Sequence, residues 1–176
     1  MNIKSEKGAT LTEVIGAVTI LLILMVPLTF IFTTTYARCV LEADKAAAQQ
    51  VAREVLYGDG INFNGIIGDL EKSNAKSNKV VINEEGCSIS IPANSGFREY
   101  LYEPDSNGGV IKYNGLSING KSSSGKEIEI IDFTLQKILK NDFNDHDQLR
   151  VQVKVTCGKS GIVEVESSYR FPNIEK

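Results

Sequence analysis

Residues 14–32 read VIGAVTILLILMVPLTFIF, an uncharged run that begins directly after Glu13, and the next charged residue is Arg38. A helix over residues 14–36 would be about 34 Å long at roughly 1.5 Å per residue, whereas the hydrocarbon core of a bilayer is about 30 Å thick. The apolar residues favour insertion by about 4 to 8 kcal/mol. A buried helix of a soluble protein is seldom apolar on every face. The run therefore predicts a membrane-spanning helix, which includes Val14, Leu21, Leu24, Pro27 and Phe32.

The remainder of the chain is more polar and is short. The whole chain has 176 residues, with 19 Lys and Arg against 22 Asp and Glu and a net charge of -3. The part after residue 57 is long enough for one small core and too short for two domains, which excludes a large multidomain enzyme. A nucleic-acid surface would need a clustered basic footprint, and the sequence has no block of Lys and Arg. We therefore expect no nucleic-acid partner.

The residues that flank the apolar run predict its orientation. Lys4 and Lys7 precede the run, so the positive-inside tendency places the N-terminus in the cytoplasm and the C-terminal domain outside. A cleaved secretory signal is the competing interpretation, with residues 35–37 as the cut site, but its apolar region would be only about 7 to 15 residues long. A lipoprotein signal would need a small residue before Cys39, where Arg38 stands.

Glu13 stands at the cytoplasmic edge of the apolar run. A carboxylate at this depth is costly to bury unless a cation meets it. From the residues alone, Glu13 either lies in the headgroup layer as an ordinary flanking charge or forms a buried pair with a cation.

Residues 7–13 read KGATLTE and lead directly into the apolar run; this arrangement resembles the processing site of type IV prepilins and pseudopilins. The resemblance implies that prepilin peptidase removes the leader, residues 1–8, after Gly8. Ala9 would become the N-methylated terminus, and Glu13 would compensate the terminal ammonium of a neighbouring subunit in a filament. The chain departs from the family at Ala9, where Phe is usual, and at Pro27, since the usual proline lies slightly deeper.

The same resemblance implies partners and a location. The partners would be other pilin subunits, prepilin peptidase, and indirectly an assembly platform with its ATPase; the location would be the membrane and then the cell surface. The hairpin from Tyr100 to Tyr113 loosely resembles larger tip-associated members, which favours a minor pilin or pseudopilin of a type IV pilus or a related secretion or competence filament. The alternative is a solitary single-pass membrane protein whose exported domain binds a ligand.

Beyond Arg38 the pattern becomes amphipathic. One helical face carries polar side chains such as Glu42, Lys45 and Arg53, and the other is apolar. The apolar members are Val40, Ala43, Ala47, Val51 and Val55. Residues 58–60, Gly-Asp-Gly, provide a stop signal. The sequence therefore predicts one helix from about Ala9 to Tyr57, made of a transmembrane and assembly part (9–37) and an amphipathic part (38–57), followed by an exported domain (58–176).

The exported domain is predicted to be rich in β-strands. A short helix over residues 63–73 is expected first, and alternating apolar residues with turn signals between them then indicate an antiparallel sheet. The expected strands are 80–82, 87–91, 98–103, 110–113, 127–135 with a bulge between Ile130 and Ile131, 149–157 and 162–171. A sheet with one dry face against the amphipathic helix gives an α+β fold. The resemblance to pilins implies the same fold, a long N-terminal helix packed on an antiparallel sheet.

Three cysteines in an oxidising setting allow three pairings. Cys87 and Cys157 both fall on inward strand faces, whereas Cys39 lies on the helix near the membrane. If a disulfide forms within the chain, we expect Cys87 to Cys157; the alternative is two buried thiols.

Two loops resemble ligand-binding motifs. Residues 120–126 mimic a phosphate-binding loop, but Glu127 stands where Ser or Thr is needed. Residues 142–147 are acidic, but Asp147 replaces the Gly that an EF-hand requires. We interpret these segments as a hairpin loop and a solvated acidic loop. No catalytic motif accompanies them, and we expect neither enzymatic activity, nor a metal, nor a cofactor.

Overall fold

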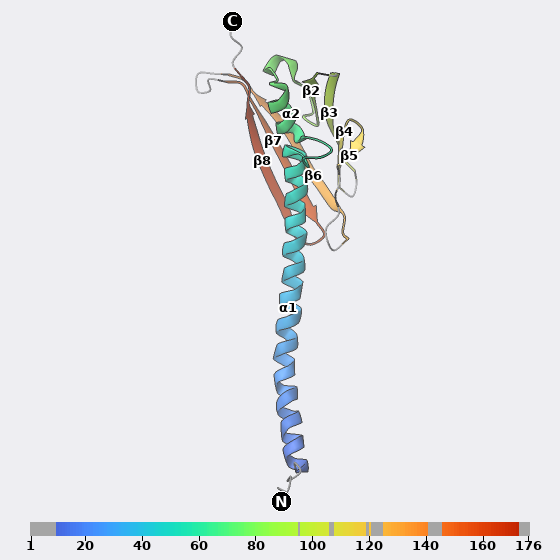
Figure 1. Cartoon of the computed structure of the whole chain (residues 1–176), viewed down its shortest axis with the longest axis vertical. Coiled ribbons are helices and arrows are strands. Elements are labelled where there is room, and N and C mark those ends of the chain that lie inside the picture. The colour runs from blue at the N-terminus through green and yellow to red at the C-terminus, as the bar shows by residue number, and fades with distance from the viewer. Residues whose placement is uncertain are drawn as a thin grey trace, which may run out of the picture. The chain divides into compact units, whose positions relative to one another are not determined.

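The computed structural model describes residues 10–94, 96–105, 108–118, 120, 125–140 and 146–172 (Figure 1). Its contacts divide the chain into two units, Met1–Val40 and Leu41–Lys176, which are described separately. The helices are α1 (Leu11–Tyr57), α2 (Gly65–Ser73) and the 3-10 helix η1 (Ser77–Lys79). The strands are β1 (Val81–Ile82), β2 (Ser88–Ala93), β3 (Gly96–Glu103), β4 (Val110–Tyr113), β5 (Leu116–Ser117), β6 (Ile128–Ile138), β7 (Gln148–Cys157) and β8 (Ile162–Arg170).

The predicted long helix is confirmed as α1, which runs through both the apolar and the amphipathic segments without a break. It ends at the predicted stop signal. Gly58 has φ +84, and its N–H donates to the carbonyl oxygen of Glu54 at 2.7 Å. A glycine with positive φ directly after a helix satisfies one of the last carbonyls without steric cost.

Gly58 also lies against the loop that follows α1. A Cβ on Gly58 would stand 2.3 Å from the carbonyl oxygen of Phe63, whereas a Cβ on Gly60, at φ +76, would meet nothing within 4 Å. Gly60→Ala therefore adds only left-handed strain, about 1 kcal/mol. Gly58→Ala adds the same strain plus a backbone displacement, and is expected to lower the free energy of unfolding by about 3 kcal/mol. Denaturant unfolding of the two variants measures the difference, and equal effects would contradict the close approach.

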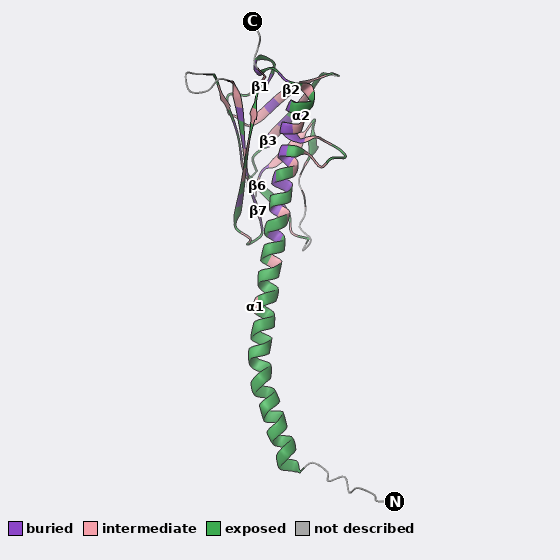
Figure 2. Cartoon of the chain, turned by 60° about the vertical axis from the view of Figure 1, so that its left-hand side comes forward, coloured by how far each residue is buried: buried purple, intermediate pink, exposed green. Residues whose placement is uncertain are grey.

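Burial on α1 is confined to its second part (Figure 2). The buried apolar residues are Ala48, Val51, Ala52, Val55 and Leu56. The prediction was right at Val51 and Val55 and wrong at Ala43, which is exposed. The buried stripe is wider than one residue per turn, because it contacts strands from two sheets.

Strands β1 to β5 form a five-stranded antiparallel meander in chain order. The predicted hairpin before β2 is confirmed, since the Oδ1 atom of Asn83 accepts the N–H groups of Cys87 and Ser88 at 2.7 and 2.8 Å. Strand β5 was not predicted. Its signal is present in the sequence, because Asn114-Gly115 is a preferred two-residue hairpin turn and both residues have positive φ.

Strands β6, β7 and β8 form a separate three-stranded antiparallel sheet. The predicted bulge is confirmed by a register shift between Ile130 and Asp132. This bulge brings Ile130 and Phe133 to the same buried side, although strict alternation would place them on opposite faces. β7 buries every second residue from Leu149 to Cys157, as its alternating pattern predicts.

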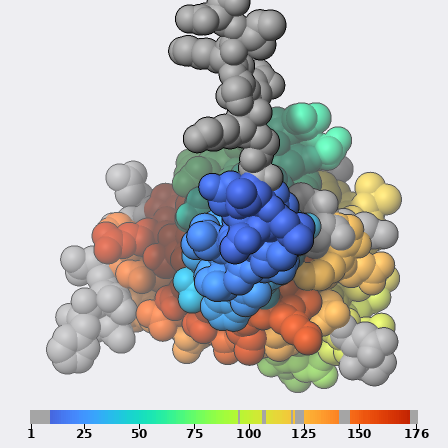
Figure 3. Space-filling view, turned by 90° about the horizontal axis from the view of Figure 1, so that it is seen from below, coloured from blue at the N-terminus to red at the C-terminus, as the bar shows by residue number. Residues whose placement is uncertain are grey.

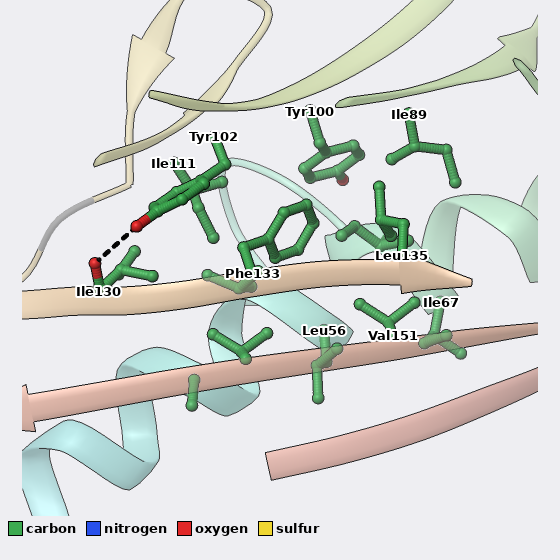
Figure 4. Packing of buried hydrophobic residues seen from close by; sticks show 14 of the residues in the cluster. Leu56, Ile67, Ile89, Tyr100, Tyr102, Ile111, Ile130, Phe133, Leu135 and Val151 are labelled. Atoms are coloured by element: carbon green, nitrogen blue, oxygen red, sulfur yellow. Dashed lines mark hydrogen bonds between the residues drawn. The ribbon is translucent and has the colours of Figure 1, made fainter. Parts of the chain in front are cut away.

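The strands expected in one sheet are thus divided between two, which meet along β6. The carbonyl oxygen of Ile130 accepts the N–H of Gly109 at 2.7 Å, and the N–H of Leu135 donates to the carbonyl oxygen of Gly86 at 3.2 Å. The hydroxyl of Tyr102 also donates to Ile130 O at 3.2 Å (Figure 4). Side chains from both sheets, α1 and α2 fill the core around this seam. The α+β class, a long N-terminal helix packed on antiparallel β-structure, is confirmed.

Of the two alternatives at Cys87 and Cys157, a disulfide or two thiols, this structure has the thiols, and Cys39 is also free. Cys157 pairs with Ile128 at the start of β6. Cys87 directly follows Gly86, whose carbonyl oxygen accepts the N–H of Leu135 near the end of β6. Seven strand residues at about 3.3 Å each separate these points by roughly 20 Å, and a disulfide needs Cα atoms within about 7 Å. Both cysteines border the core, but at different ends of it.

The two loops that resemble ligand-binding motifs fall largely outside the described residues, at 121–124 and 141–145. Asp147, at the end of the acidic loop, accepts the backbone N–H of Lys140 at 2.8 Å. The Ser77 hydroxyl and this N–H lower the pKa of Asp147. In the part of the chain that the structure describes, no group of three or more His, Cys, Asp and Glu side chains is arranged to hold a metal.

Candidate functional site at the start of the long helix

Thr10 and Glu13 form a reciprocal cap at the N-terminus of α1. The backbone N–H of Thr10 donates to the Oε2 atom of Glu13 at 2.8 Å, and the N–H of Glu13 donates to the Thr10 Oγ1 atom at 3.3 Å. This is a capping box, in which two otherwise unpaired N–H groups of the first turn are satisfied. Sequence reasoning missed it, although its signature, Thr followed three residues later by Glu, is present at residues 10–13.

An exposed apolar surface follows the cap. Val14, Leu21, Leu24, Pro27 and Phe32 are all exposed, and so is every other residue from Leu11 to Phe32. Figure 3 views the first turns of α1, in blue, from the N-terminal side. Monomeric soluble proteins rarely expose an apolar surface of this extent. Within the described residues, α1 is the one helix long and apolar enough to cross a membrane.

The hydroxyls of Thr19 and Thr29 inside this surface are satisfied within the helix itself. Each donates to the carbonyl oxygen four residues earlier, at 2.8 Å. Pro27 lacks the N–H that would donate to the Ile23 carbonyl, and the Thr29 hydroxyl bonds to Met25 rather than to Ile23. Hydroxyls bonded in this way are tolerated in lipid, because no donor is left unpaired.

The structure describes only some of the residues of the predicted site. Glu13 lies in the first turn of α1 with its side chain exposed, directly before the apolar surface. Gly8 and Ala9, the predicted processing site, lie outside the described residues. The structure thus brings the carboxylate to the edge of the apolar helix and gives it a local role in capping.

Among the described residues of the folded unit, the carboxylates of Asp69 and Asp44 are fully buried. Asp69 accepts hydrogen bonds from Asn64 Nδ2 at 2.7 Å and the Tyr100 hydroxyl at 2.9 Å, and forms an ion pair with Arg98. Burial and the neighbouring Asp69 carboxylate raise the pKa of Tyr100. Each polar group of this cluster is thus used in packing α2 on β3, so we interpret the cluster as structural.

The second buried carboxylate, Asp44, joins α1 to the start of β6. Lys126 Nζ lies 2.5 Å from Asp44 Oδ2, and this hydrogen bond raises the pKa of Lys126. Asp44 lies one turn before Ala48 on the buried face of α1, which is the signal that sequence reasoning overlooked. A buried acid within an apolar stripe requires a cation from another element.

Comparisons of the chain with known protein families, with curated proteins and with solved structures find no match. The fold and the site together define the class of the protein. It is an α+β protein with one N-terminal helix that is long and apolar enough to span a membrane, and that helix carries a capped carboxylate at its start.

Proposed function

We propose that this protein is a subunit of a filament of the type IV pilus kind, built as a minor pilin or pseudopilin. The observation that carries the proposal is the position of Glu13, a carboxylate in the first turn of a helix whose next five turns expose only uncharged residues. The KGATLTE segment at residues 7–13, with its resemblance to prepilin processing sites, supports the same function.

In the proposed mechanism, prepilin peptidase cuts the chain after Gly8. Before assembly, the protein stays anchored in the membrane by its apolar helix, with its folded domain outside. Assembly moves the apolar helix from lipid into contact with equivalent helices. The Glu13 carboxylate then meets the terminal ammonium of another subunit, since two opposite charges among apolar helices are tolerable only as a pair. Extraction from lipid requires work from outside, which an assembly platform and its ATPase would supply.

The capping box is compatible with this pairing. Thr10 occupies only the Oε2 atom of Glu13. An ionised carboxylate has about four acceptor positions on two oxygens, so one side chain can cap its own helix and accept an ammonium at once. The cap also limits the rotamers of Glu13 before assembly, which reduces the entropy lost when the pair forms.

The capping box supports a second candidate as well, because it gives Glu13 a role within a single chain. In that case the protein is a solitary single-pass membrane protein with an exported ligand-binding domain. Both candidates predict the same topology, and they differ at the N-terminus.

Intact mass of the protein extracted from its native membrane separates the two candidates. A filament subunit is expected to begin at Ala9 and to carry one additional methyl group. The same preparation from cells that lack prepilin peptidase should begin at Met1. A full-length, unmethylated chain in wild-type cells would contradict the filament proposal and favour the solitary protein.

A further inference from the structure

A cavity of about 470 Å³ lies in the folded unit, beside the C-terminal end of α1. Three segments form its walls: the last turns of α1, the loop between α1 and α2, and the β4–β5 hairpin. The lining residues that matter to its chemistry are Glu54, Asp59, Phe63, Tyr113, Leu116 and Ser117. This volume falls within the range of small-ligand pockets, about 300 to 1,000 Å³.

Two of the residues that line the cavity are acidic. Asp59 is ionised at neutral pH, because hydrogen bonds from the backbone N–H groups of Ile61, Phe63 and Asn62 lower its pKa to about 2. Glu54 is the second carboxylate, and none of the described residues that line the cavity is Lys, Arg or His. α1 also carries no basic residue in its last turn, so the partial negative charge of the helix end is not offset there.

Other residues that line the cavity are aromatic or aliphatic. The rings of Phe63 and Tyr113 lie 5.8 Å apart between centroids, and Leu116 is 73% exposed. Both rings are half-buried, so they present part of their surface to the cavity. A cavity lined by two carboxylates together with aromatic and aliphatic groups suits a cation carried on an apolar stem.

We propose that this cavity binds a lysine side chain of a partner polypeptide, with the ammonium at Glu54 and the aliphatic stem along Phe63 and Leu116. Lysine fits better than arginine, because Glu54 Oε1 already accepts Gln50 Nε2 at 2.8 Å and both oxygens of Asp59 accept internal donors. The lysine ammonium needs only one carboxylate oxygen that accepts no other hydrogen bond, whereas the planar arginine guanidinium binds best to two such oxygens at once. This site lies at the C-terminal end of α1, whereas the proposed filament contact uses Glu13 and the apolar part of the same helix, so the site does not depend on that function.

The test uses the full chain in detergent micelles with isotope-labelled Leu and Ile methyl groups, observed by NMR. The probes are N-acetyl-lysine methylamide, the arginine analogue, and the norleucine analogue, which keeps the stem and lacks the charge. The lysine probe is expected to shift the Leu116 and Ile118 methyl signals saturably. The norleucine and arginine probes should bind at least about fivefold more weakly, and 0.5 M salt should weaken lysine binding.

Glu54→Gln removes the charge and nearly preserves the shape, and is expected to weaken lysine binding about tenfold. Glu85→Gln, in the exposed turn before β2, is the matched control and should have no effect. Three results would overturn the proposal. They are binding of the norleucine probe as tight as that of the lysine probe, no shift of the methyl signals with the lysine probe, and shifts with a neutral methyl glycoside, added as a further probe, but not with the lysine probe. If Glu54→Gln fails to fold, the comparison of the lysine, arginine and norleucine probes on the wild-type chain still tests the proposal.

Discussion

Glu13→Gln is expected to reduce incorporation of the subunit into filaments by at least about tenfold, while its level in the membrane stays unchanged. Breaking a buried ion pair by removing one partner costs about 3 to 5 kcal/mol, and each 1.4 kcal/mol is a factor of ten. The cost at this position is expected to be smaller, about 1.4 kcal/mol or somewhat more, because hydration and lipid headgroups compete for the pair at the membrane edge. The measurement is the ratio of filament-bound to membrane-bound protein, determined by immunoblot of sheared and cell-associated fractions.

The capping box makes this experiment specific. Gln can replace Glu at the third position of a capping box, so Glu13→Gln removes the charge and keeps the hydrogen bond from Thr10. Thr10→Val is the matched control, since it removes the hydroxyl that caps Glu13 N–H and leaves the carboxylate. It should cost about 1 kcal/mol of helix stability and leave incorporation nearly normal. Normal incorporation of Glu13→Gln, or equal loss in both variants, would contradict the pairing role.

Arg98→Leu is expected to lower the free energy of unfolding by about 3 kcal/mol. Its partner Asp69 is fully buried, so the variant leaves a carboxylate without its cation in the interior. The hydrogen bonds from Tyr100 and Asn64 remain and keep the loss near the lower end of the expected range. Chemical unfolding in detergent, followed by near-ultraviolet circular dichroism, measures it.

Lys112→Leu is the control for this variant. Lys112 pairs with Glu103 at 2.5 Å and is as exposed as Arg98, with side-chain exposures of 34% and 33%. The two pairs differ in the acid, because Glu103 is 48% exposed and Asp69 is 0% exposed. Lys112→Leu should therefore change stability by less than about 1 kcal/mol. Equal effects of the two substitutions would show that the burial of Asp69 does not set the cost.

Local sequence patterns predicted most of the elements. The extent of α1 follows from an apolar run that continues into an amphipathic one and from Gly58 after it. The β6 bulge follows from a phase change in the apolar alternation, and the hairpin before β2 from its turn residues. Such features depend on residues within a few positions of one another, so a single sequence contains them.

Of the candidate sites, only the one at the N-terminus of α1 could be predicted from the sequence. Thr10 and Glu13 are three residues apart, so their capping box was readable in the sequence even though we did not predict it. The cavity beside α1 was not readable, because Glu54 and Leu116 reach it from segments far apart in the chain. The pairing of Asp44 with Lys126 is hidden for the same reason.

By itself, the sequence determined that this protein has one long helix, apolar for its first part, and an antiparallel β-rich unit after it. These properties arise from residue periodicity and from transfer free energy, which act locally along the chain. Only the tertiary structure decided that the strands divide into two sheets, that Cys87 and Cys157 lie apart, and that the buried carboxylates of Asp44 and Asp69 each receive a cation from another element. Those outcomes depend on which strand edges meet and on how side chains distant in sequence fill one core, and both are set by packing of the whole folded unit.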